Sequence, residues 1–376
     1  MTRYDVVVLG GGIIGAAIAE ELARSDKRVC LIERGTIGCE ASKAAAGILS
    51  AQMDLEHPDA FFELCQASRT LYPSWVAHLE RRAHRSVDYH VDGILYLALT
   101  DTGVRQMEAR QHWQTRRGFR VERWSPQEVA RREPNATEKI RAGFFFPTEA
   151  QLDNVKLMDA LSVACRRAGV TVWERTQVRR VLTHRGAIVG VETSRQTCRA
   201  PIVVNCLGSW APLVSRSSGL GMRSRTPLVV PARGQMLAFA APTRLFHHVV
   251  MSEAAYGVQR RDGRLIVGST VEFVGFEKRL TGDGMRAILS GFHRMVREKV
   301  LDRCAFQDAW VGLRPCSRDR LPILGETSVK GLYVAIGHFR HGILLAPVTA
   351  KLIAELILRG HSSFDLSPFS LSRFSK

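Results

Sequence analysis

The first 32 residues alternate between two hydrophobic patterns. Residues 6–9 are apolar without interruption, which is typical of a strand buried on both faces. Residues 13–24 repeat apolar side chains at the helical period, and residues 28–32 form a second apolar run. The pattern predicts a strand, a helix and a second strand, with a glycine-rich turn at residues 10–12.

The rest of the chain carries both patterns in turn. Helical periodicity predicts helices over 60–83, with a kink or a restart at Pro73, and over 104–117, 155–168, 283–298 and 343–358. Apolar or alternating runs predict strands over 90–99, 170–174, 181–191, 201–207, 227–230, 235–239, 255–259, 264–267 and 331–336. Strand–helix units therefore lie at both ends and in the middle, and antiparallel strands fill the gaps.

This order predicts an α/β fold that carries a second, α+β domain. We expect residues 1–85, 149–225 and 308–376 to form a discontinuous, Rossmann-like dinucleotide-binding domain. Residues 86–148 and 226–307 are expected to form a substrate-binding domain on an antiparallel sheet. Two domains suit a chain of 376 residues, which is long for one hydrophobic core.

Composition narrows the class of protein. A hydrophobic content of 45% argues against disorder. The net charge of +17 is spread over scattered Lys and Arg residues, so we read it as a solvated basic surface and expect no nucleic-acid partner. The apolar stretches 5–19 and 331–358 are interrupted by glycines or charged residues, so no membrane-spanning segment is expected.

The eight cysteines form no CxxC pair and no cluster with metal-ligand spacing. In a chain of this length they are typical of reduced, mostly buried thiols. The sequence therefore predicts a cytoplasmic protein without a metal site.

Gly10, Gly12 and Gly15 have the spacing of a dinucleotide-binding turn. Gly10 permits the tight turn, Gly12 lets the backbone approach a pyrophosphate, and Gly15 lets the helix pack on the strand. The free N–H groups of the helix N-terminus attract phosphate. Glu33 lies 23 positions beyond Gly10, where it can accept both ribose hydroxyls and would repel the 2′-phosphate of NADP. The chain is therefore predicted to bind FAD or NAD.

The small-residue segment 41–47, here called the ribbon, favours FAD over NAD. A flavin ring that lies along backbone atoms requires small side chains beneath it. A flexible loop or tight helix packing would also use such residues. Ser42 is a hydrogen-bond donor for a phosphate or the ring, or else a helix N-cap.

Four segments of the chain carry a resemblance to a known family: residues 41–49, 231–236, 310–325 and 337–347. In this order they resemble the D-amino-acid-oxidase superfamily of flavoenzymes, and within it the glycine oxidase branch of the thiamine pathway. The resemblance runs nearly from end to end of the chain.

The resemblance implies the residues that face substrate and cofactor. Arg314 would grip a substrate carboxylate with two parallel hydrogen bonds, the Tyr256 hydroxyl would touch the same carboxylate, and Arg340 would line the substrate site. A structural ion pair for Arg314 and a half-buried core position for Tyr256 are the alternatives. Together with the turn and the ribbon, the residues expected to hold FAD are Gly10, Gly12, Ile13, Ile14, Gly15, Glu33, Arg34, Ala41, Ser42, Ala46, Gly47, Ile48, Val178, His338, Phe339, Arg340, His341, Gly342, Ile343 and Leu344.

Some positions depart from the family pattern. Val271 and Ile48 stand where characterised glycine oxidases carry methionines, and Ala254 stands in place of a histidine. The pocket wall is therefore expected to differ in shape, which leaves the best substrate open. Gly312 occupies the position of the cysteine that links FAD in monomeric sarcosine oxidases, and Cys316 lies four residues on, so we expect non-covalent FAD.

The activity implied by the resemblance is oxidation of glycine and related small amines, such as sarcosine and small D-amino acids. Hydride would pass from Cα of the neutral amine to flavin N5, which needs no protein base. His338 and His341 are read as flavin-loop residues rather than bases. Hydrolysis of the imine gives a 2-oxo acid and ammonia or an amine, and dioxygen takes the electrons to give hydrogen peroxide.

Three other readings stay open. The first is a D-amino-acid or secondary-amine dehydrogenase that passes electrons to a quinone or a partner subunit. The second is the flavin subunit of a membrane-associated glycine dehydrogenase that forms cyanide, and the third is a basic nucleic-acid-binding protein with a vestigial nucleotide fold. The oligomeric state is also open, since the resemblance allows a homo-oligomer, either a dimer or a tetramer.

Overall fold

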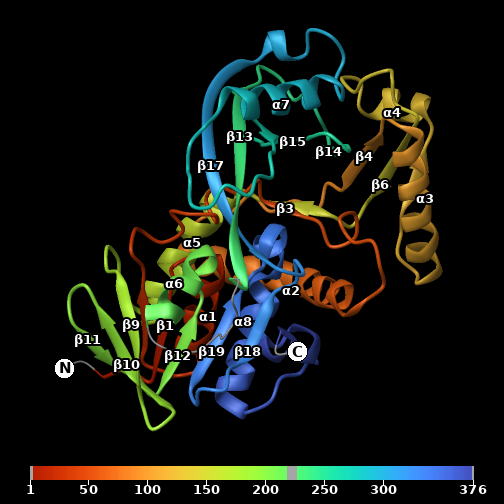
Figure 1. Ribbon diagram of the computed structural model, residues 1–376. Helices are drawn as coiled ribbons and strands as arrows, with labels where there is room; N and C mark the ends of the chain where they lie inside the picture. Colours follow the sequence, from red (N-terminus) through yellow and green to blue (C-terminus); the bar gives the residue numbers. More distant parts are fainter. Residues whose placement is uncertain (1–2, 218–226, 375–376) are drawn as a thin grey trace.

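The computed structural model describes residues 3–217 and 227–374 of the chain. These residues form two layered regions, a mainly parallel sheet below and a mainly antiparallel sheet above (Figure 1).

The lower sheet contains the opening unit that the sequence predicts. Its order is β18-β19-β12-β1-β2-β8, and all neighbours are parallel except β18, which is antiparallel to β19. The strands are β1 (Val6–Leu9), β2 (Val29–Ile32), β8 (Thr171–Trp173), β12 (Ile202–Asn205), β18 (Ile323–Glu326) and β19 (Leu332–Ile336). Parallel strands align their carboxyl ends at one edge, where such sheets bind dinucleotides.

Both faces of the lower sheet are covered, which explains its unbroken apolar runs. Val6 and Val8 pack into the helical core, whereas Val7 and Leu9 pack into the core beneath a three-stranded sheet. The helices of the first face are α1 (Ile13–Ala23), α5 (Asn154–Arg167) and α8 (Gly342–Arg359), with α2 (Ala60–Ala83) packed across α5 and α8. The strands that cover the other face are β9 (Val178–His184), β10 (Ala187–Thr193) and β11 (Thr197–Arg199).

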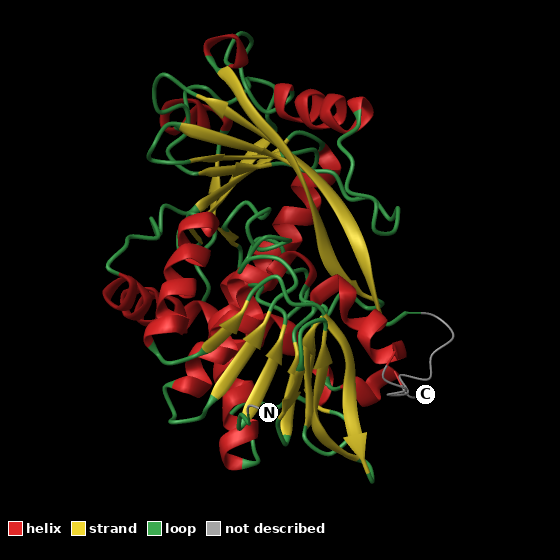
Figure 2. Cartoon of the chain, turned by 90° about the vertical axis from the view of Figure 1, so that its left-hand side faces the viewer, coloured by secondary structure: helices red, strands yellow, loops and turns green. Residues whose placement is uncertain are grey.

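The upper sheet has eight strands in the order β17-β13-β16-β15-β14-β4-β6-β5. Helix α7 (Gly282–His293) packs on β13 and β16. Figure 2 shows the long β13–β17 pair reaching from the upper sheet toward the lower one. The strands are β4 (Ile94–Ala98), β5 (Glu122–Trp124), β6 (Ala142–Phe146), β13 (Val229–Ala240), β14 (Val249–Met251), β15 (Tyr256–Gln259), β16 (Arg264–Gly268) and β17 (Ala305–Ser317).

Short elements complete the described chain. The small sheet of β3 (Ile48–Leu49) and β7 (Ala150–Gln151) continues directly from the ribbon. The remaining elements are α3 (Asp101–Arg116), α4 (Pro126–Arg132), α6 (Ala211–Ser217) and the 3-10 turns η1 (Gly208–Trp210), η2 (Leu301–Arg303), η3 (Phe339–His341), η4 (Ser367–Phe369) and η5 (Leu371–Phe374).

The predicted fold class is confirmed, and the opening strand, helix and strand lie where the sequence places them. One difference concerns the predicted strands 227–230 and 235–239, which form the single strand β13. Pro231 does not break it, because the pairing of β13 with β16 begins only at Met236, and at Pro231 the strand pairs with β17 alone, facing Pro315.

Other differences come from turns and ends. The predicted strand 181–191 is a hairpin, β9–β10, which turns at Arg185 and Gly186 with φ values of +49° and +79°. Helix α2 contains Pro73 without ending there, and α7 ends at His293 rather than at residue 298. The short strand β14 was not predicted.

The strands of the lower sheet come from the residue ranges predicted for the dinucleotide-binding domain, and most strands of the upper sheet come from those predicted for the substrate-binding domain. The proposed boundary at residue 308 falls inside β17, and the one between 225 and 226 lies outside the described residues. The division into domains therefore stays a prediction.

Within the described ranges, one helix, Phe339–Arg359, is long and apolar enough to span a membrane by length and composition. In the structure 67% of its most apolar window is buried inside the protein, as in the core helix of a folded domain. The predicted lack of a membrane segment remains an expectation.

Candidate active site

A cavity of about 780 Å³ is lined by residues from both sheets. Its lining includes the carboxyl ends of β1 and β2, the ribbon, the start of α8, and residues of β13, β15 and β17. The dinucleotide turn and the predicted carboxylate-binding residues therefore face one continuous space.

At the dinucleotide end, the glycines are required by close backbone contacts. Gly10 has φ +99°, and a Cβ there would lie 2.6 Å from the Cys206 carbonyl oxygen. A Cβ on Gly15 would lie 2.0 Å from the Gly10 carbonyl oxygen, so α1 could not pack on the turn. Gly15, in the first turn of α1, is thus a packing residue and does not line the cavity.

The N-terminus of α1 presents free donors to the cavity. The Ser42 hydroxyl accepts a hydrogen bond from the Ile13 N–H at 2.9 Å, so the ribbon caps the helix from outside. Among the described residues no acceptor takes the N–H groups of Gly12 and Ile14, which line the cavity. Free N–H groups at a helix N-terminus, beside a residue without a side chain, suit a diphosphate.

Glu33 lies at the end of β2 and is 9% exposed. Its carboxylate accepts hydrogen bonds from the Gly11 N–H at 2.7 Å and the Gly35 N–H at 2.8 Å. A carboxylate has about four acceptor sites, so ribose hydroxyls would still find lone pairs. Arg34 is exposed and lies over the Trp210 ring, with 3.8 Å from Cζ to the ring centroid.

The ribbon is held by side chains that take its carbonyl oxygens. The Asn154 amide donates to the carbonyls of Ser42 at 3.0 Å and Lys43 at 2.9 Å. The Trp310 indole N–H donates to the carbonyl of Ala44 at 3.0 Å.

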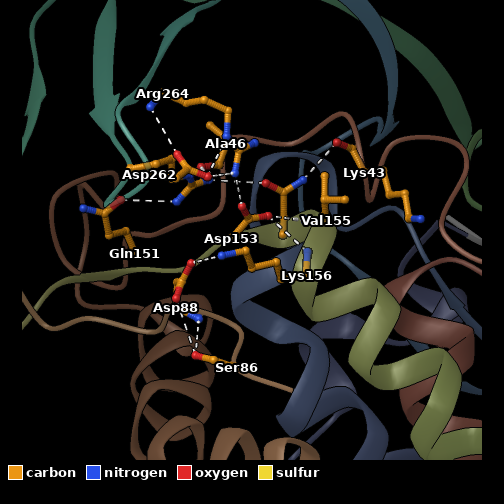
Figure 3. A network of polar contacts seen from close by, with 12 residues as sticks. Lys43, Ala46, Ser86, Asp88, Gln151, Asp153, Val155, Lys156, Asp262 and Arg264 are labelled. Atoms are coloured by element: carbon orange, nitrogen blue, oxygen red, sulfur yellow. Dashed lines mark hydrogen bonds and ion pairs between the residues drawn. The ribbon is translucent and has the colours of Figure 1, made fainter. Parts of the chain in front are cut away.

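Arg260 completes this set, which we call the carbonyl clamp: Asn154, Trp310 and Arg260. Its guanidinium donates to the Ala46 carbonyl at 2.6 Å and to the Gln151 and Asn154 side-chain oxygens at 3.2 and 3.4 Å. Figure 3 shows this meeting point of the ribbon, the start of α5 and the β15–β16 turn.

The loop before α8 forms another wall. His338 is 3% exposed and its Nε2 lies 3.1 Å from the Thr349 hydroxyl; burial lowers the pKa of His338 to about 3, with a smaller contribution from His341. Burial also lowers the pKa of His341, whose ring meets Phe61 edge-on at 5.1 Å between centroids. Both imidazoles are therefore neutral at physiological pH and serve as polar wall residues rather than as cations.

At the carboxylate end, Arg314 extends from β17 into the cavity. It donates to the Thr270 carbonyl at 3.1 Å and to the Ser269 hydroxyl at 2.8 Å. No acidic side chain of the described residues forms an ion pair with it. Burial lowers the pKa of Arg314, and Arg340 adds to this effect while Tyr256 opposes it. A half-buried guanidinium that faces a cavity without a carboxylate partner is suited to receive one from a ligand.

Glycines make room for this end of the cavity. A Cβ on Gly234 of β13 would lie 2.0 Å from Arg314 Nη1, and one on Gly268 of β16 would lie 2.5 Å from the Tyr256 hydroxyl. That hydroxyl donates to the Met236 sulfur at 3.1 Å, which is a weak acceptor. A ligand oxygen would be a better acceptor, so Tyr256 is free to exchange partners.

The residues that depart from the family pattern also face this space. Val271, Ala254 and Ile48 line the cavity, and Val271 is 39% exposed. Arg340 lines it as well, but its side chain is exposed and its Cζ lies 5.3 Å from the centroid of the Phe339 ring.

Apart from Gly15, every residue expected from the sequence to bind substrate or FAD lines this one cavity. Sequence reasoning missed the residues that hold those groups in place: Ser269, Thr270, Asn154, Trp310 and Arg260. For Asn154 the only local signal was its place at the start of a helix, and the others gave none, because their partners lie far away in sequence. The binding roles themselves stay proposals.

Comparison with known proteins gives the family. The family described as FAD dependent oxidoreductase (DAO) matches residues 5–356. The chain belongs to this family. It is 33% identical to the glycine oxidase of Geobacillus kaustophilus over 99% of this chain and 97% of that protein.

A solved structure and a second relative are also similar to this chain. The crystal structure of the Geobacillus kaustophilus glycine oxidase superposes with a TM-score of 0.94, at 32% identity and 99% coverage of both chains. The bifunctional protein ThiO/ThiG of Trichormus variabilis is 35% identical over 100% of this chain, which spans 56% of that protein. The predicted resemblance is thus confirmed, and the protein is an FAD-dependent oxidoreductase.

The residues present fit FAD. Gly10 and Gly12 leave the cavity free of side chains beside the open N–H groups of α1, and Glu33 stands at the end of β2. The ribbon supplies the small lining that a flat ring needs.

Proposed function

We propose that this protein oxidises glycine and related small amines, such as sarcosine and small D-amino acids. The products would be the 2-oxo acid, ammonia or an amine, and hydrogen peroxide. The observation that supports this most directly is the half-buried guanidinium of Arg314, which shares one cavity with the dinucleotide turn and has no acidic partner among the described residues.

Each residue in this site has a defined task. Arg314 would bind the substrate carboxylate through two parallel hydrogen bonds, and Tyr256 would donate to the same group after leaving Met236. Arg340, on the cavity wall, would add positive charge at its mouth. These contacts fix the position of Cα, so the chain contributes positioning and electrostatics rather than a base.

Bound FAD supplies the electron acceptor, since its N5 can take up hydride from Cα. The amine must be neutral for its lone pair to form the imine as the Cα–H bond breaks. Hydrolysis of the imine with water releases the 2-oxo acid. Dioxygen takes up two electrons and two protons to give hydrogen peroxide.

A substrate panel with purified, yellow protein tests the proposal. We expect peroxide with glycine, sarcosine, D-alanine or D-proline, and none with an amine that lacks a carboxylate. Val271 and Ala254 line the cavity with short side chains, so turnover of the larger substrates would measure how much space the substrate site has. If no α-amino acid reduces the flavin under anaerobic conditions, the proposed substrate class is wrong.

The electron acceptor is tested in the same assay. A D-amino-acid or secondary-amine dehydrogenase would reduce its flavin with substrate but give little peroxide in air. An artificial quinone-like acceptor would then raise turnover. Peroxide equal to substrate consumed supports the oxidase.

The cellular role is proposed by likeness. Relatives named glycine oxidase and ThiO/ThiG support a place in thiamine synthesis, and a cytoplasmic location is a further part of the proposal. A dimer or tetramer is also part of the proposal, and light scattering of the purified protein would measure it.

A further inference from the structure

The carbonyl clamp controls which edge of the ribbon faces the cavity. It binds the carbonyl oxygens of residues 42, 43, 44 and 46 from outside. Among the described residues, no acceptor takes the N–H groups of Ala45, Ala46 and Gly47, and all three residues line the cavity. The ribbon's carbonyl oxygens therefore bind protein side chains, whereas these N–H groups stay available to a ligand in the cavity.

Arg260 differs from the other two members because it carries charge. It is 6% exposed, and its contacts on the ribbon, Gln151 and Asn154 are all neutral oxygens. Burial lowers the pKa of Arg260 to about 10, so the side chain remains a cation at neutral pH. A Cβ on Gly47 would lie 2.8 Å from its Nη2, which places the charge directly behind the cavity wall.

The nearby acids are engaged elsewhere. Asp153 and Asp262 pair with Arg264 at 2.5 and 2.7 Å, and Asp88 pairs with Lys156 (Figure 3). No carboxylate of the described residues forms an ion pair with Arg260. Its positive charge is therefore left unneutralised by direct contact, next to the backbone donors of the ribbon.

We propose that Arg260 is a positioning residue that aims the ribbon N–H groups at the flavin and stabilises the reduced cofactor electrostatically. Reduction adds negative charge to the ring, which backbone donors and a nearby cation favour. The inference requires FAD, which family membership supplies, but it does not depend on which amine is oxidised.

The test measures FAD binding and the flavin midpoint potential, neither of which needs turnover. In Arg260→Met we expect the FAD dissociation constant to rise about tenfold or more. We also expect the equilibrium between oxidised and reduced flavin to shift about tenfold toward the oxidised form, which lowers the midpoint potential by ~30 mV for a two-electron couple. Arg261→Met removes a charge from the exposed neighbouring residue and should leave both values unchanged.

Two further variants separate charge from geometry. Arg260→Lys keeps the positive charge but loses the planar guanidinium that donates several hydrogen bonds at once. FAD should therefore bind a few-fold more weakly, while the midpoint potential stays near that of the wild type. Trp310→Phe removes a neutral clamp donor and should weaken FAD binding without moving the potential. Both variants also keep the proposal testable if Arg260→Met does not fold.

The proposal is overturned if Arg260→Met lowers only the melting temperature while FAD affinity and potential stay at wild-type values. The electrostatic part is overturned if Arg260→Lys shifts the potential as far as Arg260→Met. A shifted potential in a protein that oxidises none of the amines would support this inference and count only against the proposed substrate.

Discussion

The two ends of the cavity are assembled in opposite ways. At the dinucleotide end, Gly10, α1 and Glu33 lie within one stretch of 24 residues and meet through a single βαβ unit. At the carboxylate end, Arg314 on β17 meets Ser269 across 45 residues and Tyr256 across 58, from the far side of β13 in the upper sheet. Local assembly leaves a motif in the sequence, whereas assembly across a sheet leaves separate residues with no shared spacing.

The ends also differ in the groups that they offer. The dinucleotide end presents backbone N–H groups, which any residue could supply once glycine permits the geometry. The carboxylate end presents side chains instead, the Arg314 guanidinium and the Tyr256 hydroxyl, and the planar guanidinium has no equivalent among other residue types. Substitutions should therefore act on folding and FAD binding at the first end and on substrate at the second.

The largest expected effect is at the carboxylate end. Arg314→Ala should retain FAD and the yellow colour but lower kcat/KM by about 100-fold or more, roughly 3 kcal/mol, because the substrate carboxylate loses its charged partner. Steady-state kinetics with glycine and FAD absorbance measure the two properties. Arg286→Ala, on the exposed surface of α7 where Arg286 pairs with Asp283, is the control. Wild-type turnover in Arg314→Ala would remove Arg314 from the proposed role.

At the dinucleotide end, Gly15→Ala should lower the free energy of unfolding by about 3 kcal/mol and release FAD. The added Cβ would lie 2.0 Å from the Gly10 carbonyl oxygen, so α1 must move away from the turn. Thermal unfolding and FAD titration measure the change. Gly282→Ala, where no atom lies within 4 Å of the new Cβ, should be nearly neutral. An FAD-loaded Gly15→Ala of wild-type stability would contradict this account.

Outside the cavity lining, Glu149 should make stability depend on pH. Glu149 is fully buried, one carboxylate oxygen has no partner, and burial raises its pKa to about 8 although Arg69 opposes this. The folded state therefore holds a proton that the unfolded state releases near pH 4.5, so this contribution to stability is present at low pH and is lost as pH rises toward 8.

The matching variant is Glu149→Gln, which imitates the protonated acid. It should lie within about 1 kcal/mol of the wild type at pH 5 and exceed it at pH 7 by on the order of 3 kcal/mol, because the folded state keeps the proton of Glu149 at a cost of about 1.4 kcal/mol for each pH unit above 4.5. Chemical denaturation at several pH values gives the comparison. Parallel pH profiles for the two proteins would show that Glu149 is ionised in the fold.

The smallest expected effect concerns Ser269. Its hydroxyl accepts from Arg314 at 2.8 Å, so its own proton points elsewhere, and Ser269 lines the cavity. Ser269→Ala should raise KM five- to tenfold with little change in kcat, about 1 kcal/mol, since one neutral hydrogen bond is lost. Ser74→Ala, an exposed hydroxyl on α2, is the control. If kcat falls and KM does not, Ser269 acts on the reacting centre instead.

Much of the fold was predictable because its signals are local. The opening strand, helix and strand, the start of α5 and most of α8 follow from apolar periods within single segments. Two predictions were wrong. Strand β13 was predicted as two strands because it contains Pro231, which is tolerated where the strand pairs on one side only, and the β9–β10 hairpin was predicted as one strand because its turn was overlooked. The pairing partners of a strand decide these cases, and no single segment contains them.

By itself, the sequence determined the dinucleotide turn, the acid at the end of the second strand and the small size of the ribbon residues. Glycine spacing and side-chain volume are properties of the chain that hold wherever it folds. Only the tertiary structure decided that Ser42 caps α1, that Thr270 and Ser269 hold Arg314, and that Arg260 takes the Ala46 carbonyl. Each contact joins residues that lie 29 or more positions apart, and the contact of Arg260 with Ala46, 214 positions apart, forms only after the upper sheet has packed on the ribbon.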